Sequence, residues 1–174
     1  MMATRSPRQP VNSGVEMTPG HTPVLLNEVI DALNPRDGGI YVDGTLGGGG
    51  YARAILDAAD CTVLGIDRDP DAIARNEPLL EIYGAGLKLI PGRFGDMDSL
   101  VRGLGIDGVD GVTLDLGVSS PQIDVAERGF SFAKDGPLDM RMERAGESAA
   151  DVVNTASETD LSNIVFRLGE ERHA

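Results

Sequence analysis

The segment "YVDGTLGGGGYARAIL", residues 41–56, joins a short apolar strand to four consecutive glycines, Gly47–Gly50, and then to a predicted helix. Loops of this composition let a ligand approach the backbone closely, and many hold a phosphate at the N-terminus of the helix that follows. The segment therefore predicts a ligand site between a strand and a helix. It leaves open whether that ligand carries a phosphate.

The alternation of strand and helix continues on both sides of this loop. Apolar patterning predicts strands at 40–42, 61–67, 87–90 and 108–118, and helices within 22–34, 52–59, 68–80 and 91–104. Thr22 and Pro23 suit the start of the first helix, and Asn34-Pro35 suits its end. Nearly continuous apolar strands that alternate with helices indicate an α/β fold, Rossmann-like, with a parallel sheet covered on both faces.

Composition limits the classes of function. The 174 residues carry a net charge of −13, so any nucleic-acid site must be local. A single cysteine, Cys61, cannot form an intrachain disulfide, and we expect a cytoplasmic protein. We expect no membrane span, because no run of about 20 apolar residues occurs. Neither His21 nor His173 belongs to a cluster with metal-ligand spacing, so we expect no metal site.

Acidic residues follow the predicted strands. Asp43, Asp67 and Asp115 come at the ends of the first, second and fourth strands, and "GRFGD", residues 92–96, follows the third. A single aspartate at a strand end commonly caps the next turn. Because parallel strands end at the same edge of a sheet, four such ends favour a ligand site there.

Two ligands fit the glycine loop. Gly47-x-Gly49-x-x-Ala52, with Asp67 20 residues after Gly47, matches the dinucleotide fingerprint and allows an NAD(P)-dependent oxidoreductase. The other candidate is S-adenosylmethionine, which has a ribose for Asp67 but no phosphate. Asp43 would repel a pyrophosphate and helps to hold a cationic ligand. "GIDRDPDAIA", residues 65–74, also resembles the second motif of class I methyltransferases, although Thr45 stands where these often have glycine.

Five segments together carry a more specific resemblance: "HTPVLLNEV" (21–29), "YVDGTLGGGGY" (41–51), "LDLGVSSPQID" (114–124), "ERGFSF" (127–132) and "DGPLDMRM" (135–142). In this order they closely resemble the bacterial ribosomal RNA small-subunit methyltransferase H family, from His21 to the end of the chain. The resemblance implies a class I methyltransferase that uses S-adenosylmethionine to methylate N4 of a cytidine in the decoding centre of 16S ribosomal RNA. The implied partner is 16S ribosomal RNA or the small ribosomal subunit.

The resemblance also implies a domain organisation. We expect a disordered tail over 1–20, the first part of the methyltransferase domain over 21–118, and an active-site and substrate loop over 119–148. Helices capped by Ser148 and Ser157 would begin an inserted helical domain over 149–174. The last helix stops in mid-pattern, so we expect the chain to be part of a longer protein.

Carried over residue by residue, the family's cofactor site falls on Gly49, Gly50, Tyr51, Asp67, Phe94, Asp115 and Gln122. Asp67 would accept from the ribose, Phe94 would either cover the adenine or belong to the core, and Gln122 would hold a polar edge of the cofactor. Asp115 is the candidate catalytic acceptor near the target amine. Tyr51 departs from the histidine that is common in the family.

The segment 125–145 allows two interpretations of its basic residues, Arg128, Lys134, Arg141 and Arg144. One is a structured loop with internal ion pairs and with Phe130 and Phe132 in the core. The other is a surface that binds RNA phosphates and stacks on bases.

Overall fold

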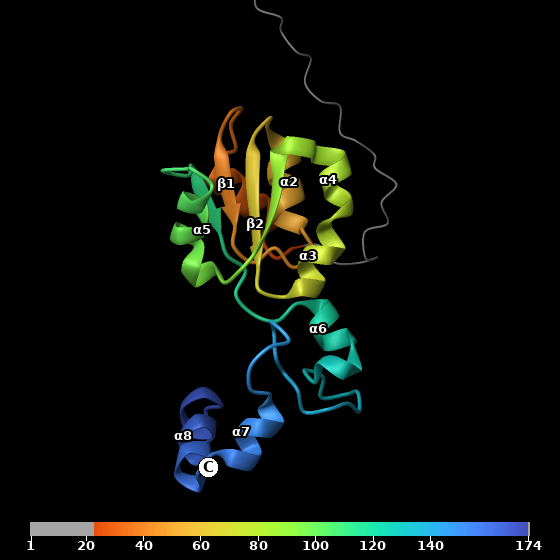
Figure 1. The fold of residues 1–174 in the computed structure, drawn as a ribbon, viewed down its shortest axis with the longest axis vertical. Coiled ribbons are helices and arrows are strands. Elements are labelled where there is room, and N and C mark those ends of the chain that lie inside the picture. The colour runs from red at the N-terminus through yellow and green to blue at the C-terminus, as the bar shows by residue number, and fades with distance from the viewer. Residues whose placement is uncertain (1–22, 174) are drawn as a thin grey trace, which may run out of the picture. The chain divides into compact units, whose positions relative to one another are not determined.

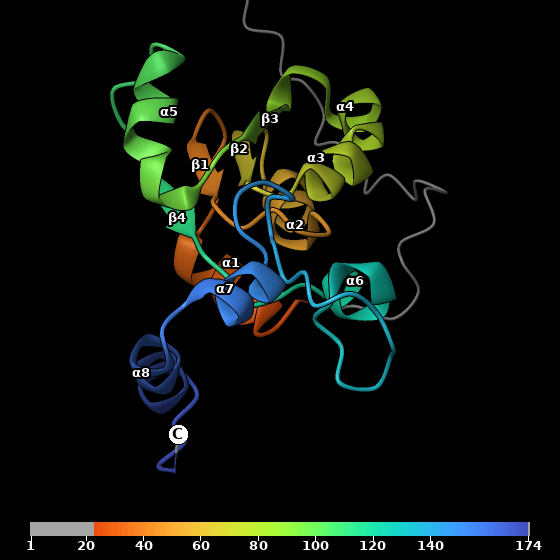
Figure 2. The same cartoon turned by 60° about the horizontal axis from the view of Figure 1, so that its bottom comes forward.

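The structure of the chain, a computed structural model, describes residues 23–173, which fall into two compact units divided between Gly117 and Val118. The expected tail over 1–20 and the expected helix cap Thr22 lie outside the described residues. The first unit holds a four-stranded sheet in the order β3-β2-β1-β4 (Figure 2). The strands are β1 (Ile40–Asp43), β2 (Thr62–Asp67), β3 (Leu87–Pro91) and β4 (Gly111–Thr113).

All strand pairs are parallel, which confirms the predicted α/β, Rossmann-like class. Asp43, the last residue of β1, is paired with Gly65 of β2 and Thr113 of β4. Asp67, the last residue of β2, is paired with Pro91 of β3. This register brings the carboxyl ends of all four strands to one edge of the sheet.

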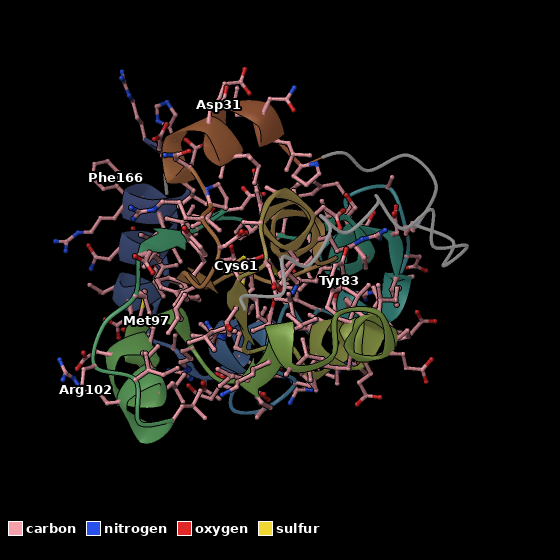
Figure 3. All side chains as sticks on the ribbon, turned by 90° about the horizontal axis from the view of Figure 1, so that it is seen from above. Asp31, Cys61, Tyr83, Met97, Arg102 and Phe166 are labelled. Atoms are coloured by element: carbon pink, nitrogen blue, oxygen red, sulfur yellow. The ribbon has the colours of Figure 1, made fainter. Side chains whose placement is uncertain are left out.

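Side chains of alternating residues build a core on each face of the sheet. Figure 1 shows α5 (Met97–Gly103) on one side of the strands and α2 (Gly50–Ala58), α3 (Pro70–Asn76) and α4 (Pro78–Tyr83) on the other. On the α5 face, Val42, Leu64 and Ile66 pack against Val101. The opposite core also receives α1 (Leu26–Leu33) and contains Tyr41, Val63, Ile55, Leu79 and Tyr83. In Figure 3, Met97 and Arg102 of α5 accordingly lie far from Tyr83.

The first helix begins later than predicted. It starts at Leu26 rather than Pro23, because Leu25 has a left-handed backbone (φ 52°) that cannot continue a right-handed helix. Its end at Leu33, with Asn34 as the cap before Pro35, agrees with the prediction.

Two further elements differ from their predicted extents. The single helix expected over 68–80 is two helices, because the backbone of Pro78 has no N–H to continue the hydrogen-bond ladder. The strand expected over 108–118 is paired only at Gly111–Thr113. Beyond it, the N–H of Asp115 donates to the hydroxyl of Thr45 instead of to a neighbouring strand.

The second unit is mainly helical and irregular. It contains α6 (Ser120–Asp124), a 3₁₀ turn at Ala126–Arg128, α7 (Ala149–Thr155) and α8 (Glu158–Leu168). Ser148 and Ser157 cap α7 and α8 by accepting the backbone N–H of Asp151 and Asp160, as predicted. Among the described residues, 23–173, no helix has both the length and the apolar character needed to cross a membrane.

Candidate cofactor-binding site

The glycine loop is fastened to the end of β2. The N–H of Leu46 donates to the carbonyl of Ile66 at 3.0 Å, and the N–H of Gly47 donates to Oδ2 of Asp67 at 2.8 Å. The N–H of Gly49 turns inward to the carbonyl of Leu46 at 2.6 Å. Three N–H groups at the loop are therefore engaged within the protein, one of them by a carboxylate.

Asn76 binds the carbonyl of the same glycine, Gly47, a role that the sequence pattern did not reveal. Its Nδ2 donates to the carbonyl of Gly47 at 3.0 Å and to that of Ala72 at 2.8 Å, and the side chain is buried. Arg75 adds a longer bond of 3.4 Å to the Gly47 carbonyl. The end of α3 thus fixes the loop together with Asp67.

Internal packing accounts for two of the glycines at the predicted site. Gly49 has φ +76°, and a Cβ there would collide with Oδ1 of Asn76. A Cβ on Gly50 would lie 3.1 Å from Cδ of Pro23 and still closer to its Cγ. Both residues must therefore be glycine for the loop to pack, whatever ligand it binds.

Asp43, at the end of β1, binds the backbone on both sides of the four glycines. Its carboxylate is fully buried and accepts the N–H groups of Thr45 and Ala52, each at 3.2 Å. Burial, opposed by these two hydrogen bonds and reinforced by the charges of Asp67 and Asp115, raises the pKa of Asp43 to about 7. Asp43 thus lies among acids at this edge, since β1, which it ends, is paired with β2 and β4.

Thr45 joins the loop to the end of β4. Its Oγ1 accepts the N–H of Asp115 at 2.7 Å, which gives a structural reason for threonine at this position. The Asp115 residue is exposed just beyond the strand. Its side chain is thus presented at the same edge as Asp43 and Asp67.

Phe94 follows β3 in the 3₁₀ turn Phe94–Asp96 and is 41% exposed, so it is not a core residue. Its Cβ lies 3.3 Å from the position that a Cβ on Gly44 would occupy, at the end of β1. An exposed aromatic ring therefore borders the acidic edge. Such a ring can cover the face of a flat base.

The side chain of Tyr51 is engaged inside the protein. It is 7% exposed, and its hydroxyl donates to the backbone carbonyl of Val24. Burial, with smaller effects of Asp115 and Asp43, raises the pKa of its phenol, which keeps the hydroxyl protonated as a donor.

Gln122 lies in the second unit, in α6. It is buried, and its Oε1 accepts the N–H of Ser119 at 2.9 Å in the capping box that starts this helix. The structure therefore gives Gln122 a local structural role within its own unit.

Comparison with known proteins identifies the family. The model of the MraW methylase family matches residues 18–174. The chain belongs to the MraW methylase family. It is 63% identical over 152 residues to Ribosomal RNA small subunit methyltransferase H of Paramagnetospirillum magneticum, covering 87% of this chain and 48% of that protein. The protein of the same name from Parvibaculum lavamentivorans is 60% identical over 163 residues, 94% of this chain and 48% of that protein. The chain thus spans about half the length of these relatives.

In this MraW methylase family member, Arg128 and Arg141 of the second unit bond to groups within that unit. Arg128 is 4% exposed and donates to the carbonyls of Arg141 and Met142 at 3.0 and 2.9 Å. The guanidinium of Arg141 donates to both carboxylate oxygens of Asp139 at 2.6 to 3.1 Å. These hydrogen bonds lower the pKa of the Asp139 carboxyl to about 2. The structured-loop interpretation is confirmed for both arginines. It is wrong for Phe132, whose ring is fully exposed.

The described part of this family member offers no group of three or more His, Cys, Asp or Glu side chains arranged to hold a metal ion. The three acids at the sheet edge differ from such a group, because Asp43 and Asp67 are occupied by backbone N–H donors. The arrangement instead suits an organic ligand that offers hydroxyl and cationic groups.

Proposed function

We propose that the protein transfers a methyl group from S-adenosylmethionine to the N4 amine of a cytidine in the decoding centre of 16S ribosomal RNA. The family and the names of its relatives support methylation of ribosomal RNA of the small subunit. The segments "ERGFSF" and "DGPLDMRM" support the finer choice of base and atom, through the resemblance that they carry.

The observation that carries the choice of cofactor is the hydrogen bond between the Gly47 N–H and the Asp67 carboxylate, at 2.8 Å. In a dinucleotide site, N–H groups of the glycine loop face a pyrophosphate. Here a phosphate would have to displace a carboxylate, with Asp43 buried directly beneath the loop. This arrangement favours a ligand without phosphate that carries positive charge, and it disfavours the NAD(P) alternative.

The residues at the edge fit S-adenosylmethionine by their chemistry. Asp67 keeps lone pairs for ribose hydroxyls, since each carboxylate oxygen can accept more than one hydrogen bond. Phe94 offers its exposed ring to the adenine, and the backbone at Gly49, Gly50 and Tyr51 would line the methionine portion. We keep Gln122 among the proposed cofactor-binding residues because the resemblance implies it. Its Oε1 also accepts the N–H of Ser119.

When bound, S-adenosylmethionine supplies an electrophilic methyl group on a sulfonium. The amine of cytosine is a weak nucleophile, because its lone pair is delocalised into the ring. An exposed carboxylate at Asp115 would orient this amine and stabilise the positive charge that grows on its nitrogen. We therefore propose Asp115 as the catalytic acceptor and assign no general base.

The proposed partner is 16S ribosomal RNA or the small ribosomal subunit, and the proposed location is the cytoplasm, where these subunits are found. The target cytidine must be unpaired or flipped out of its stack for the amine to reach the site.

Calorimetric titration of the protein expressed from its complete gene tests the cofactor assignment. We expect S-adenosylmethionine to bind, NAD and NADP to give no heat above dilution, and Asp67→Ala to abolish the S-adenosylmethionine signal. Tight binding of NAD or NADP without binding of S-adenosylmethionine would replace this proposal with an oxidoreductase.

A further inference from the structure

The residues just before α1 lie against the glycine loop, although more than 20 positions separate them in sequence. We call Pro23–Leu25 the N-terminal turn. Pro23 occupies the space that a side chain on Gly50 would fill, and the Val24 carbonyl accepts the Tyr51 hydroxyl. Two consecutive residues at the start of α2 thus contact the same turn.

The N-terminal turn has an unfavourable conformation that needs support. Leu25 has φ 52°, in the left-handed region that is unfavourable for a residue with a Cβ atom. Val24 and Leu25 are each 64% exposed, so burial of their own side chains contributes little to holding the turn. The Tyr51 hydroxyl is a buried contact that fixes its backbone.

The same turn lies beside residues of the proposed cofactor site. Its partners, Gly50 and Tyr51, follow the glycine loop directly, and the N–H of the next residue, Ala52, donates to the buried carboxylate of Asp43. Exposed apolar side chains at Val24 and Leu25 therefore border the place proposed for the cofactor. They would exclude water from one side of a bound ligand.

We infer that the Tyr51 hydroxyl positions the N-terminal turn as one wall of the cofactor site, and that the cofactor meets position 51 only through the backbone. This inference rests on the proposed function for the identity of the ligand. It makes Tyr51 a positioning residue, and it explains how tyrosine serves at a position where histidine is common.

Tyr51→Phe removes the hydroxyl and keeps the buried ring. Tyr83→Phe is the matched control, because Tyr83 is similarly buried and its hydroxyl donates to Asp57 at 2.8 Å rather than to the N-terminal turn. A neutral hydrogen bond contributes about 1 kcal/mol, which corresponds to about fivefold in an equilibrium constant. We expect Tyr51→Phe to weaken S-adenosylmethionine binding about fivefold, while Tyr83→Phe changes only the unfolding midpoint.

Hydrogen exchange provides a readout that needs no cofactor. The N–H of Val29 donates to the carbonyl of Leu25 at 2.9 Å, so its protection reports the order of the turn. We expect Tyr51→Phe, and not Tyr83→Phe, to speed exchange at Val29 about fivefold in the ligand-free protein. Leu25→Asn, which tolerates the left-handed backbone, should preserve this protection and the unfolding midpoint while weakening cofactor binding.

The outcomes separate this inference from the proposed function. If the wild type binds no S-adenosylmethionine, both the proposed function and the role of the turn as a wall of the cofactor site are wrong. Exchange at Val29 still decides in that case whether Tyr51 holds the turn. If the wild type binds and Tyr51→Phe changes neither affinity nor exchange, the inference is overturned. Equal losses of affinity in Tyr51→Phe and Tyr83→Phe would also overturn it, since they would indicate a general loss of stability.

Discussion

Replacing Asp43 with asparagine gives a stability change that depends on pH in a defined direction. Asp43 is fully buried, and its pKa is raised from an ordinary value of 3.8 to about 7. Between these two values the folded protein holds a proton that the unfolded chain has released. The free energy of unfolding therefore falls as the pH rises from about 4 to about 7, and it is level above that range.

The magnitude follows from the size of the shift. The raised pKa corresponds to about 4 kcal/mol in the free energy of unfolding, of which roughly 2–3 kcal/mol is lost between pH 5 and pH 8. Asparagine does not titrate, so this part of the pH dependence disappears in Asp43→Asn. The variant keeps only one of the two side-chain oxygens that accept the N–H groups of Thr45 and Ala52, which lowers its stability by a similar amount at both pH values.

Urea unfolding of wild type and Asp43→Asn at pH 5 and pH 8, without ligand, measures how the difference in their free energies of unfolding changes with pH. We expect the variant to gain roughly 2–3 kcal/mol relative to wild type on going from pH 5 to pH 8. Asp98→Asn, at an exposed carboxylate on α5, is the control and should follow the wild-type curve. Parallel pH curves for wild type and Asp43→Asn would refute the argument that burial of Asp43 raises its pKa.

Three further predictions concern the packing of both units. Gly49→Ala should lower the free energy of unfolding by about 2–4 kcal/mol, through its left-handed backbone and the collision with Asn76. Gly103→Ala, which meets nothing within 4 Å, should not lower it in the same urea titration, and equal effects would contradict this account of the loop. Arg128→Met should cost about 2–4 kcal/mol because two partly buried carbonyls lose the donor that the buried Arg128 supplies, and a cost below about 0.5 kcal/mol would contradict that role. Burial raises the pKa of Cys61 to about 11, so a disulfide reagent at pH 8 should modify the native thiol about 100-fold more slowly than the urea-unfolded one, and equal rates would count against its burial.

The α/β class and the gathering of strand-end acids at one edge of the sheet were predictable, because both depend on patterns that are local in sequence. Apolar runs that alternate with helical periods predicted the parallel sheet, and the register places the predicted strand-end acids Asp43 and Asp67 at one edge. Parallel pairing alone brings such residues together, so no knowledge of side-chain contacts was needed.

The contacts that fix the loop were not predictable in the same way. In the sequence, nothing distinguishes Asn76 from other polar residues of a helix. Its amide reaches the Gly47 carbonyl only because α3 packs against the loop. Thr45 stands where class I methyltransferases often have glycine, and the sequence offered no reason for it. In the structure its hydroxyl accepts the N–H of Asp115. Such pairs lie 29 and 70 positions apart, and local periodicity carries no information at that range.

The start of the first helix shows a conflict between local and tertiary preferences. Thr22-Pro23 has the sequence of a helix start, yet the helix begins at Leu26 after the left-handed Leu25. The contacts of the turn with Gly50 and Tyr51 explain the difference, because they stabilise a backbone that local propensity disfavours.

Transfer of a methyl label tests the central claim most directly. Small ribosomal subunits that lack the modification, and naked 16S ribosomal RNA, are incubated with methyl-labelled S-adenosylmethionine and the protein expressed from its complete gene. The RNA is then digested to nucleosides. The account predicts label in N4-methylcytidine from a single position of the decoding centre, and its loss in Asp115→Ala. Label in any other nucleoside, or no transfer by a protein that binds S-adenosylmethionine, would contradict it.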